Sequence, residues 1–447
     1  MARKVFISVL GASFYENSRY GRSDTKFVSS ETRFVQQATL EYLKADRWSE
    51  NDAAYILVTN KAKTENWDKT ITRRKHHTRG EEDYMGLEKV IEDMHLPFST
   101  IPLPIKDGNS EDEMWSIFQK LYENLQEGDQ LYFDLTHSFR YIPMLVLVLG
   151  NYAKFLKHTT VCNITYGNYE VGRLREDKIS PIIDLLPLTM LQDWTFAAAD
   201  LIRNGNIQRL QELTKENALP PMLRARGRRN IERATVEQPL SRYVEELGNM
   251  LTDMKLCLGP NILNGQSVKA INDQYENVTN HYSDLVAPIR PIIDTIQDTF
   301  KTFKTTTEID PVEIQNGYEA ARWCYEHQLY QQAFTILDEN ITTEFCAFLG
   351  TDDKNYPQRK ATNAMLRHRD YQDEDWKGEK LDGIRENVLR AIREKPEIVS
   401  FITGYSDMAK WIHDKRNTYN HASMASKPLS QTDIEELGKK IKLLTDE

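Results

Sequence analysis

An arginine, an asparagine and a histidine near the C-terminus have the types and spacing needed to handle a phosphate and a proton together. They are Arg416, Asn417 and His421, in the segment Asp414 to His421. A histidine can move protons between a 2′-hydroxyl and a leaving 5′-oxygen, and an arginine can stabilise the charge that builds on a phosphorane. An amide can orient either group. We therefore predict that these three residues cleave RNA without a metal ion.

The spacing fits the end of a helix. Asn417 and His421 are four residues apart and share a helix face, whereas Arg416 reaches in from the side. The alternative is an exposed helix end, where basic side chains interact favourably with the helix dipole. The same arginine-to-histidine spacing occurs at Arg322 and His327, but a tryptophan that looks like a core residue follows Arg322. We interpret that second pair as structural.

A second group of candidates lies in the segment Asp134 to Arg140, between a predicted strand and a predicted helix. Thr136 or Ser138 can cap the helix, and free amides at a helix start attract phosphate. His137 and Arg140 can donate hydrogen bonds to phosphate oxygens. The alternative is an ordinary capped junction in which Asp134 is a structural hydrogen-bond acceptor.

Three more strand ends carry compatible residues. The candidate ligand-binding residues there are Gly11, Ala12 and Ser13, then Thr59, Asn60 and Lys61, and finally Tyr166 and Gly167. The small residues after the first strand allow a ligand to approach the backbone closely. Tyr166 can stack on a base. Because the turn is not G-x-G-x-x-G, ordinary dinucleotide binding is poorly supported.

Alternating strand and helix patterns position these N-terminal candidates. The predicted strands are Lys4–Leu10, Ala54–Thr59, Ser99–Leu103, Gln130–Asp134 and Val161–Tyr166. The predicted helices between them are Glu31–Lys44, Tyr84–His95, Glu111–Leu125 and Tyr141–Leu156. This alternation predicts an α/β Rossmann-like domain over residues 1–185, with a largely parallel sheet that binds ligands at the carboxyl ends of its strands.

Beyond Pro187 the patterns become helical. The predicted helical segments are Thr189–Glu216, Val236–Leu256, Ala270–Phe303, Val312–His327, Tyr330–Leu349, Ile384–Glu394, Gly404–Asn420 and Gln431–Leu444. Glycine and proline predict breaks at Gly227, at Gly259 and Pro260, and from Pro288 to Pro291. The polar, threonine-rich segment Lys301–Thr307 is a candidate linker. We therefore predict an all-α linker region over residues 186–310 and an all-α domain over residues 311–447.

Composition limits the partners. The net charge of −10 argues against a protein that coats nucleic acid non-specifically. Two basic segments, residues 73–79 and 224–233, either contact a ligand or face water. No stretch approaches the roughly 20 apolar residues of a membrane helix, and the N-terminus lacks a signal-peptide pattern. We therefore expect no membrane partner. The four cysteines are scattered and form no metal-type pair, so we also expect no bound metal and a cytoplasmic location.

The two motifs also resemble known families. The string Arg416-Asn417-x3-His421 resembles the signature of HEPN ribonucleases, which are all-helical and pair their motifs across a dimer. The segment Asp134 to Arg140, with Leu10-Gly11 and Tyr166-Gly167, resembles the CARF sensor domains of CRISPR-associated proteins. The order CARF, helical linker, HEPN is similar to that of ancillary ribonucleases of type III CRISPR systems.

This resemblance implies a homodimer or higher oligomer that cleaves single-stranded RNA and leaves 2′,3′-cyclic phosphate ends. It implies activation by a cyclic oligoadenylate, cA4 or cA6, and no other cofactor. Two alternatives stay open. The chain is a nucleotide-sensing regulator or dimerisation protein without nuclease activity, or its sensor also degrades the ligand with Thr136, His137 or Arg140. A metal-dependent nuclease is disfavoured, because no pair of metal-binding motifs stands out.

Overall fold

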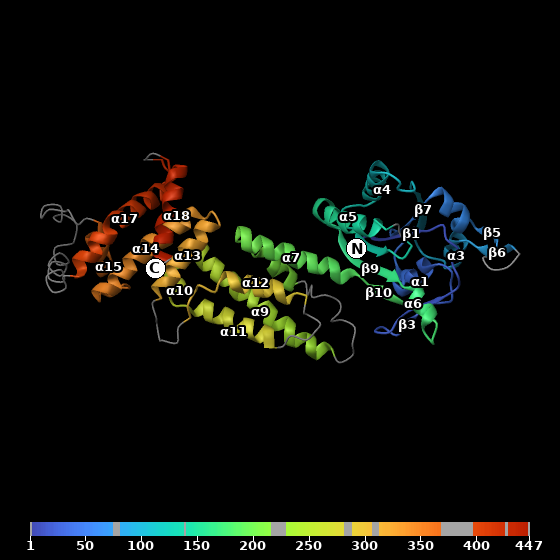
Figure 1. The fold of residues 1–447 in the computed structure, drawn as a ribbon, viewed down its shortest axis with the longest axis horizontal. Coiled ribbons are helices and arrows are strands. Elements are labelled where there is room, and N and C mark those ends of the chain that lie inside the picture. The colour runs from blue at the N-terminus through green and yellow to red at the C-terminus, as the bar shows by residue number, and fades with distance from the viewer. Residues whose placement is uncertain are drawn as a thin grey trace. The chain divides into compact units, whose positions relative to one another are not determined.

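The chain folds as two compact units. The computed structural model describes residues 2–74, 81–137, 140–215, 229–280, 288–305, 313–367, 397–424 and 428–445. The N-terminal unit is formed mainly by Met1–Gln192, and the C-terminal unit by Asp193–Leu219 and Ile231–Glu447. Each unit is described by itself below (Figure 1).

The N-terminal unit is built around five parallel strands. They are β1 (Lys4–Leu10), β4 (Ala53–Val58), β7 (Ser99–Pro104), β8 (Gln130–Asp134) and β9 (Thr160–Gly167). Within the sheet they run in the order β9-β8-β1-β4-β7. Renumbered in chain order and read from β7 to β9, this is the 3-2-1-4-5 order of a doubly wound Rossmann-type fold. The predicted α/β class and the five predicted strands are confirmed.

Short strands that we did not predict extend this sheet beyond β9. They are β10 (Ile179–Asp184), β2 (Arg19–Arg22) and β3 (Phe27–Val28), and β10 runs antiparallel to β9. A separate hairpin pairs β5 (Thr70–Arg74) with β6 (Glu81–Met85). These strands are short, and all except β3 contain charged residues, glycine or proline, so they lack the continuous apolar runs of the central strands.

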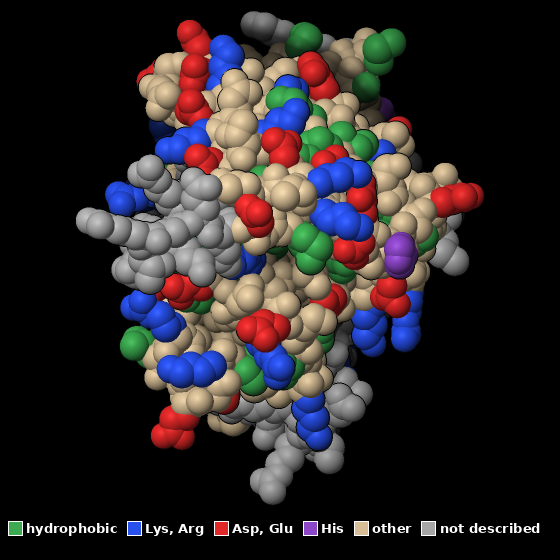
Figure 2. Space-filling model, turned by 90° about the vertical axis from the view of Figure 1, so that its right-hand side faces the viewer, with side chains coloured by type: hydrophobic (Ala, Val, Ile, Leu, Met, Phe, Trp, Pro, Cys, Tyr) green, Lys and Arg blue, Asp and Glu red, His purple; other side chains and the backbone are tan. Residues whose placement is uncertain are grey.

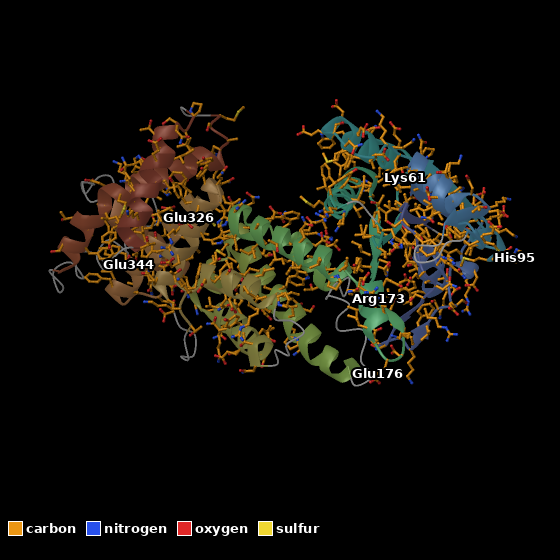
Figure 3. The ribbon with its side chains drawn as sticks, turned by 45° about the vertical axis from the view of Figure 1, so that its right-hand side comes forward. Lys61, His95, Arg173, Glu176, Glu326 and Glu344 are labelled. Atoms are coloured by element: carbon orange, nitrogen blue, oxygen red, sulfur yellow. The ribbon has the colours of Figure 1, made fainter. Side chains whose placement is uncertain are left out.

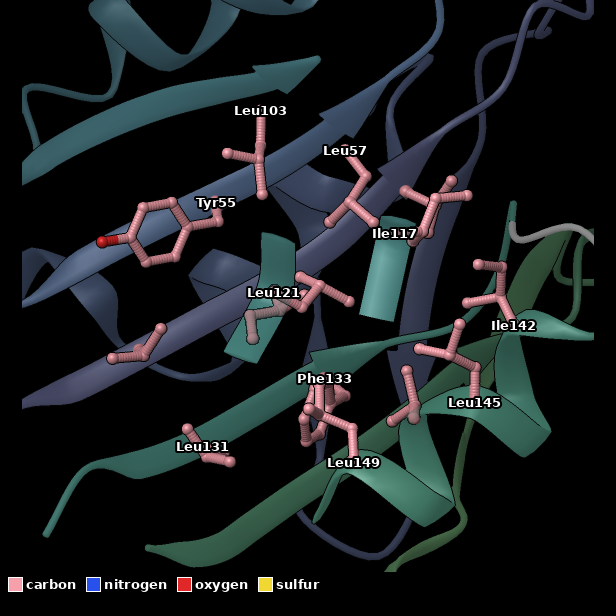
Figure 4. Packing of buried hydrophobic residues seen from close by; sticks show 14 of the residues in the cluster. Tyr55, Leu57, Leu103, Ile117, Leu121, Leu131, Phe133, Ile142, Leu145 and Leu149 are labelled. Atoms are coloured by element: carbon pink, nitrogen blue, oxygen red, sulfur yellow. The ribbon is translucent and has the colours of Figure 1, made fainter. Parts of the chain in front are cut away.

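Helices cover both faces of the sheet. They are α1 (Val35–Tyr42), α3 (Leu87–Asp93), α4 (Glu111–Glu123), α5 (Ile142–Lys157) and α6 (Tyr169–Leu174), with short turns η1 (Ala45–Arg47), α2 (Asn60–Ala62) and η2 (Lys63–Trp67). On one face, Leu121 of α4 and Leu145 and Leu149 of α5 pack against Leu131 and Phe133 of β8 (Figure 4). Helix α1 is shorter than predicted, because Thr32 forms a bridge with Ser18 instead.

The C-terminal unit is mostly helical, as predicted. Its described helices are α7 (Leu186–Asn204), which begins in the N-terminal unit, α8 (Gln208–Lys215), α9 (Arg229–Lys255), α10 (Gly259–Leu263), α11 (Gln266–Asn280), α12 (Arg290–Thr299), α13 (Ile314–Glu326), α14 (Tyr330–Leu349), α15 (Tyr356–Arg367), α17 (Glu397–Asn420) and α18 (Gln431–Thr445).

Several predicted helix boundaries were wrong. The helix predicted over Thr189–Glu216 is broken at Gly205, whose φ of +65° ends α7. The break predicted from Pro288 to Pro291 falls at the start of α12, so the segment Ala270–Phe303 forms two helices, α11 and α12, as expected. Helices α10 and α15 were not predicted. The helix predicted over Ile384–Glu394 lies outside the described residues.

The candidate linker Lys301–Thr307 is tied to a helix where the structure describes it. The amide of Lys304 donates to Asn316 Oδ1 at 2.7 Å, and Asn316 Nδ2 donates to the carbonyl of Lys304 at 2.9 Å. Asn316 belongs to α13, so residues up to 305 do not form a free connection. The predicted boundary between a linker region ending at residue 310 and a domain beginning at residue 311 stays a prediction.

Gly317 allows α13 and α14 to pack closely. A Cβ on Gly317 would lie 2.1 Å from Asn340 Oδ1. Asn340 is buried and its Nδ2 donates to the carbonyl of Ile314 at 2.9 Å. We expect Gly317→Ala to lower the free energy of unfolding by about 1–3 kcal/mol in urea denaturation, because the overlap forces a shift of packed helices.

The matched control for this substitution is Gly404→Ala in α17, where a Cβ would have no neighbour within 4 Å. That change should be neutral or should stabilise by up to about 1 kcal/mol, because alanine favours a helix over glycine. Equal effects of the two substitutions would contradict the packing argument.

Candidate ligand site and candidate nuclease site

The predicted ligand residues follow neighbouring strands of the parallel sheet. The loops after β4, β1, β8 and β9 leave the sheet at one edge, since these strands are parallel and adjacent. The strand order reverses between β1 and β8, and ligands of such folds bind at that point. There the two loops meet, because a Cβ on Gly11 would lie 3.7 Å from the Cβ of His137.

A buried network holds the loop after β8. Ser8 Oγ donates to Asp134 Oδ2 at 2.7 Å, and Thr136 Oγ1 donates to Asp134 Oδ1 at 2.6 Å. The amide of Gly167 donates to Thr136 Oγ1 at 2.8 Å. Burial raises the pKa of Asp134, while these hydrogen bonds oppose the rise. Asp134 and Thr136 therefore fix the positions of the loops that follow β8 and β9.

His137 is the polar side chain that this network presents at the switch point. Its ring stacks on that of Tyr15, with centroids 4.1 Å apart and planes inclined by 25°. Burial lowers the pKa of His137 to about 4, so the imidazole is neutral at pH 7. Its Nε2 is buried and has no hydrogen-bond partner within the described part of the chain. A buried nitrogen without a partner is unusual in a folded protein and marks His137 as a candidate functional residue.

The low pKa of His137 predicts a pH dependence of stability. The unfolded chain takes up a proton on this imidazole near pH 6.5, and the folded chain only near pH 4. The free energy of unfolding should therefore fall as the pH is lowered through this window, by about 2–3 kcal/mol from His137. Urea denaturation between pH 7.5 and 4.5 measures the effect. His137→Phe, which keeps a ring beside Tyr15, should lose this contribution; parallel curves for both proteins would exclude it.

Three residues that sequence reasoning missed shape the loop after β1. Asn66, in the π-helical turn η2, donates through Nδ2 to the carbonyls of Gly11 and Ser13, both at 2.8 Å. Arg33 Nη1 donates to the carbonyl of Tyr15 at 2.8 Å. Tyr15 itself lies against Gly11, because its Oη is 2.3 Å from where a Cβ on Gly11 would be. No motif marks these residues, since their contacts join segments far apart in sequence.

The other ligand candidates are spread along the edge. Thr59 is buried and accepts from the amide of Ala62 at 3.1 Å, which caps α2. The exposed candidates are Ser13, Asn60, Lys61, Arg140 and Tyr166, and Figure 3 shows Lys61 at the surface of the N-terminal unit. Ser138 and most of the basic segments 73–79 and 224–233 lie outside the described residues. Figure 2, which faces one end of the N-terminal unit, shows interspersed positive and negative side chains.

The C-terminal motif lies at the end of α17, against α14. Arg416 Nη2 donates to Glu339 Oε1 at 3.3 Å, and Nη1 is 3.6 Å from Asp338 Oδ2. Both acids belong to α14. Asp338 is almost fully buried, whereas about a quarter of the Arg416 side chain is exposed. Two carboxylates therefore neutralise and orient the guanidinium.

A second histidine, which sequence reasoning missed, completes this cluster. His413 Nδ1 is 3.2 Å from Asp338 Oδ2, and Asn417 Nδ2 is 2.9 Å from His413 Nε2. The simplest assignment has Nδ1–H donating to the carboxylate and Nε2 accepting from the amide. His413 and Asn417 are four residues apart, so helical spacing alone could have found the pair. The side chain of Asn417 thus contacts His413, whereas Asn417 and His421 share only a backbone hydrogen bond in the described structure, from the amide of His421 to the carbonyl of Asn417 at 3.1 Å.

His421 ends α17 and is exposed. The amide of Ser423 donates to the carbonyl of Thr418, and that of Ala422 to the carbonyl of Tyr419, both at 2.9 Å. This is a Schellman ending with His421 at the C-cap and Ala422 in the left-handed region, φ 49°. The motif therefore combines a held arginine with a histidine that faces solvent in the single chain.

The pair interpreted as structural, Arg322 and His327, is held within the C-terminal unit. Arg322 forms an ion pair with Glu319 and donates to Thr302 Oγ1 at 3.1 Å. The His327 ring stacks on Trp323, and its Nδ1 and Nε2 lie 2.7 and 3.1 Å from the carbonyls of Trp323 and Ile202. These contacts explain the spacing without a catalytic role.

The described residues lack two kinds of feature. None of their helices combines the length and apolar character that crossing a membrane requires. Nor do three or more histidine, cysteine, aspartate or glutamate side chains come together there in a way that could hold a metal ion.

The N-terminal unit is similar to a known protein family. Residues 5–170 match the family described as the CARF domain of the CRISPR system endoribonuclease Csx1. The matched range contains all five parallel strands and the loops that follow β1, β4 and β8. The N-terminal unit is therefore a CARF domain.

The chain is also related to a CRISPR-associated protein. It is 22% identical over 375 residues to the CRISPR-associated protein MJ1674 of Methanocaldococcus jannaschii. The alignment covers 77% of this chain and 54% of that protein, so the chain matches about half the length of this relative. The chain is thus a CARF-containing protein related to the ancillary proteins of CRISPR systems.

Proposed function

We propose that this chain is a cytoplasmic endoribonuclease of type III CRISPR defence that a cyclic oligoadenylate, cA4 or cA6, activates to cut single-stranded RNA without a metal ion. The observation that carries the proposal is the helix end at Arg416, Asn417 and His421, in a chain whose first unit is a CARF domain. Its helical part acts as a HEPN domain.

The residues of this helix end divide the chemistry. Arg416, held by Asp338 and Glu339, is oriented to stabilise negative charge on a scissile phosphate. His421 is exposed and moves a proton from the 2′-hydroxyl or to the leaving 5′-oxygen. Asn417 positions the cluster through His413. Attack by the 2′-hydroxyl leaves a 2′,3′-cyclic phosphate and a 5′-hydroxyl.

A second copy of the chain supplies the other half of the site. One helix end presents one exposed histidine, whereas the reaction needs a base and an acid. The N-terminal unit carries an apolar stripe that suits pairing: Met144, Val148, Tyr152 and Phe155 of α5 are 73%, 55%, 45% and 79% exposed. Exposed apolar patches of this kind often mark protein interfaces. A two-fold dimer brings identical patches together.

The activator binds at the strand-end edge of the sensor. Neutral His137, with its unpaired Nε2, lies where the loops after β1 and β8 meet. The loops that carry Arg140 and Lys61 leave the sheet at the same edge, and their side chains are exposed. For activation, the ligand must bind the active arrangement more tightly than the resting one.

A nucleotide-sensing regulator without nuclease activity is the second candidate. The pairing of Arg416 with two carboxylates favours it, because a guanidinium so neutralised has less charge to offer a phosphate. The two candidates differ in what happens to RNA when ligand is added.

A cleavage assay separates them. Labelled single-stranded RNA is incubated with the full chain alone and with cyclic tri-, tetra- or hexa-adenylate, and the fraction cut is measured. We expect one ring size to accelerate cleavage at least about tenfold over the chain alone. Tight binding of a ring, measured by calorimetry, without any cleavage would favour the regulator.

A further inference from the structure

Two arginines share one carboxylate in the C-terminal unit. Glu339 lies on α14; its Oε1 accepts a hydrogen bond from Arg416 of α17, and its Oε2 accepts one from Arg359 of α15. A carboxylate and a guanidinium form their strongest pair when two parallel N–H···O bonds use both oxygens. Because Arg359 occupies Oε2, Arg416 is limited to Oε1.

Arg359 is held firmly. Its Nη2 donates to Glu339 Oε2 and to the backbone carbonyl of Glu339, both at 2.8 Å, and its Nη1 donates to Thr343 Oγ1 at 2.9 Å. Charge-assisted hydrogen bonds are usually about 2.7–2.9 Å long, so Arg359 and Glu339 have the geometry of a strong pair. Thr343 lies one helical turn after Glu339, so these contacts fix Arg359 against one stretch of α14.

Arg416 is held loosely by comparison. Its hydrogen bond to Glu339 is 3.3 Å long, and its Nη1 is 3.6 Å from Asp338 Oδ2. Its Nε is buried and has no partner within the described part of the chain. Buried donors of a purely structural arginine are normally satisfied. Arg416 therefore keeps hydrogen-bonding capacity that its two acids do not use.

The charge of Arg359 also weakens the attraction between Glu339 and Arg416. A second cation beside the acid opposes part of the field that the carboxylate exerts on Arg416. Without Arg359, Glu339 could turn both oxygens toward Arg416 and form a bidentate pair. A guanidinium in such a pair has less charge and fewer donors to offer a phosphate.

We propose that Arg359 is a positioning residue of the candidate nuclease site, which holds Glu339 so that the Arg416 guanidinium stays able to bind a phosphate of the RNA substrate. When a phosphate binds, Arg416 exchanges its long contact with Glu339 for the phosphate, and Arg359 continues to compensate the carboxylate. The role toward a phosphate rests on the proposed nuclease function, whereas the effect of Arg359 on Arg416 does not. The arrangement also reconciles the two acids beside Arg416 with phosphate binding.

RNA cleavage by four proteins tests this role. They are the wild type, Arg359→Gln, Glu339→Gln and the chain with both substitutions, each supplied with the activating cyclic oligoadenylate. Arg359→Gln should slow single-turnover cleavage about tenfold, a coupling typical of one ion-pair network. In chains that carry Glu339→Gln it should cost about twofold or less, because an amide attracts Arg416 less than a carboxylate does. Arg359→Lys keeps the charge and should retain more activity than Arg359→Gln.

Chemical modification tests the effect on Arg416 without RNA or activator. Phenylglyoxal reacts with guanidinium groups, and mass spectrometry of the peptide that contains Arg416 follows the rate. We expect Arg359→Gln to slow this modification at least about threefold, because Glu339 then pairs with Arg416 through both oxygens. Adding Glu339→Gln should restore the rate. Arg209→Gln is the matched control, since Arg209 pairs with Glu212 on α8, and it should change neither measurement.

The outcomes are distinct. An equal cost of Arg359→Gln with and without Glu339→Gln would mean that Arg359 only stabilises the packing of α15, and would overturn the inference. A modification rate of Arg416 that Arg359→Gln leaves unchanged would overturn it as well. If thermal melting shows that Arg359→Gln does not fold, Arg359→Met, which is long and uncharged, takes its place. The expected modification rates in a chain that no ring activates to cut RNA would overturn the proposed nuclease function alone.

Discussion

Replacing His421 by glutamine should reduce activator-dependent RNA cleavage by about 10²–10⁴-fold, the usual contribution of a general acid or base. The free energy of unfolding should change by less than about 0.5 kcal/mol, because the side chain is exposed at the end of α17. Single-turnover cleavage of a labelled RNA measures the first effect, and urea denaturation the second. Together they separate chemistry from folding.

His95→Gln is the matched control for this substitution. His95 is also an exposed histidine that follows the end of a helix, and its own φ is positive. It lies in the N-terminal unit, away from the motif in the sequence. Its replacement should leave cleavage within about twofold of the wild type. Full activity of the His421 variant, with the same dependence on activator, would show that this histidine does not take part in the reaction.

Replacing Asp338 by asparagine should lower the free energy of unfolding by about 2–4 kcal/mol. Removing one partner of a buried ion pair usually costs about 3–5 kcal/mol, and the effect is smaller here because His413 and Arg416 are 29% and 24% exposed. The change removes the negative charge that faces Arg416 and His413 while keeping the shape of the side chain. RNA cleavage should also fall, since Arg416 loses one of the two acids that orient it.

Asp414→Asn provides the comparison for Asp338. Asp414 is exposed on α17, so its replacement should change stability by less than about 0.5 kcal/mol in the same urea titration. A loss of stability no larger for Asp338 than for Asp414 would contradict the role of the buried carboxylate. It would also weaken the argument that α14 positions the motif.

The central sheet could be predicted because its strands are nearly continuous apolar runs. Predicted and observed bounds coincide for Lys4–Leu10 and Gln130–Asp134, whose residues are mostly buried. The strand Ile179–Asp184 escaped prediction, because Pro181 interrupts it and its partners are one antiparallel and one short strand. Periodicity finds the long central strands of such a fold more readily than the short strands that extend the sheet beyond β9.

The candidate sites also combine features that could be predicted from the sequence with features that could not. Sequence order alone placed the loops after β1, β4, β8 and β9 at one edge, because parallel strands impose it. The contacts within the sites depend on long-range packing instead. Asp338 and His413 are 75 residues apart, and Tyr15, in the loop after β1, stacks on His137 in the loop after β8. Spacing within one helix could reveal Asn417 beside His413, but not the acids on α14 that hold Arg416.

The most direct test is to identify the RNA ends produced in the presence of a chelator. The full chain is incubated with single-stranded RNA, an activating cyclic oligoadenylate and excess EDTA, and the termini are determined by enzymatic labelling and mass spectrometry. We expect cleavage to persist and to leave 2′,3′-cyclic phosphate and 5′-hydroxyl ends, as attack by the neighbouring 2′-hydroxyl requires. Cleavage that EDTA abolishes, or products with 5′-phosphate ends, would contradict the assignment of the reaction to Arg416 and His421.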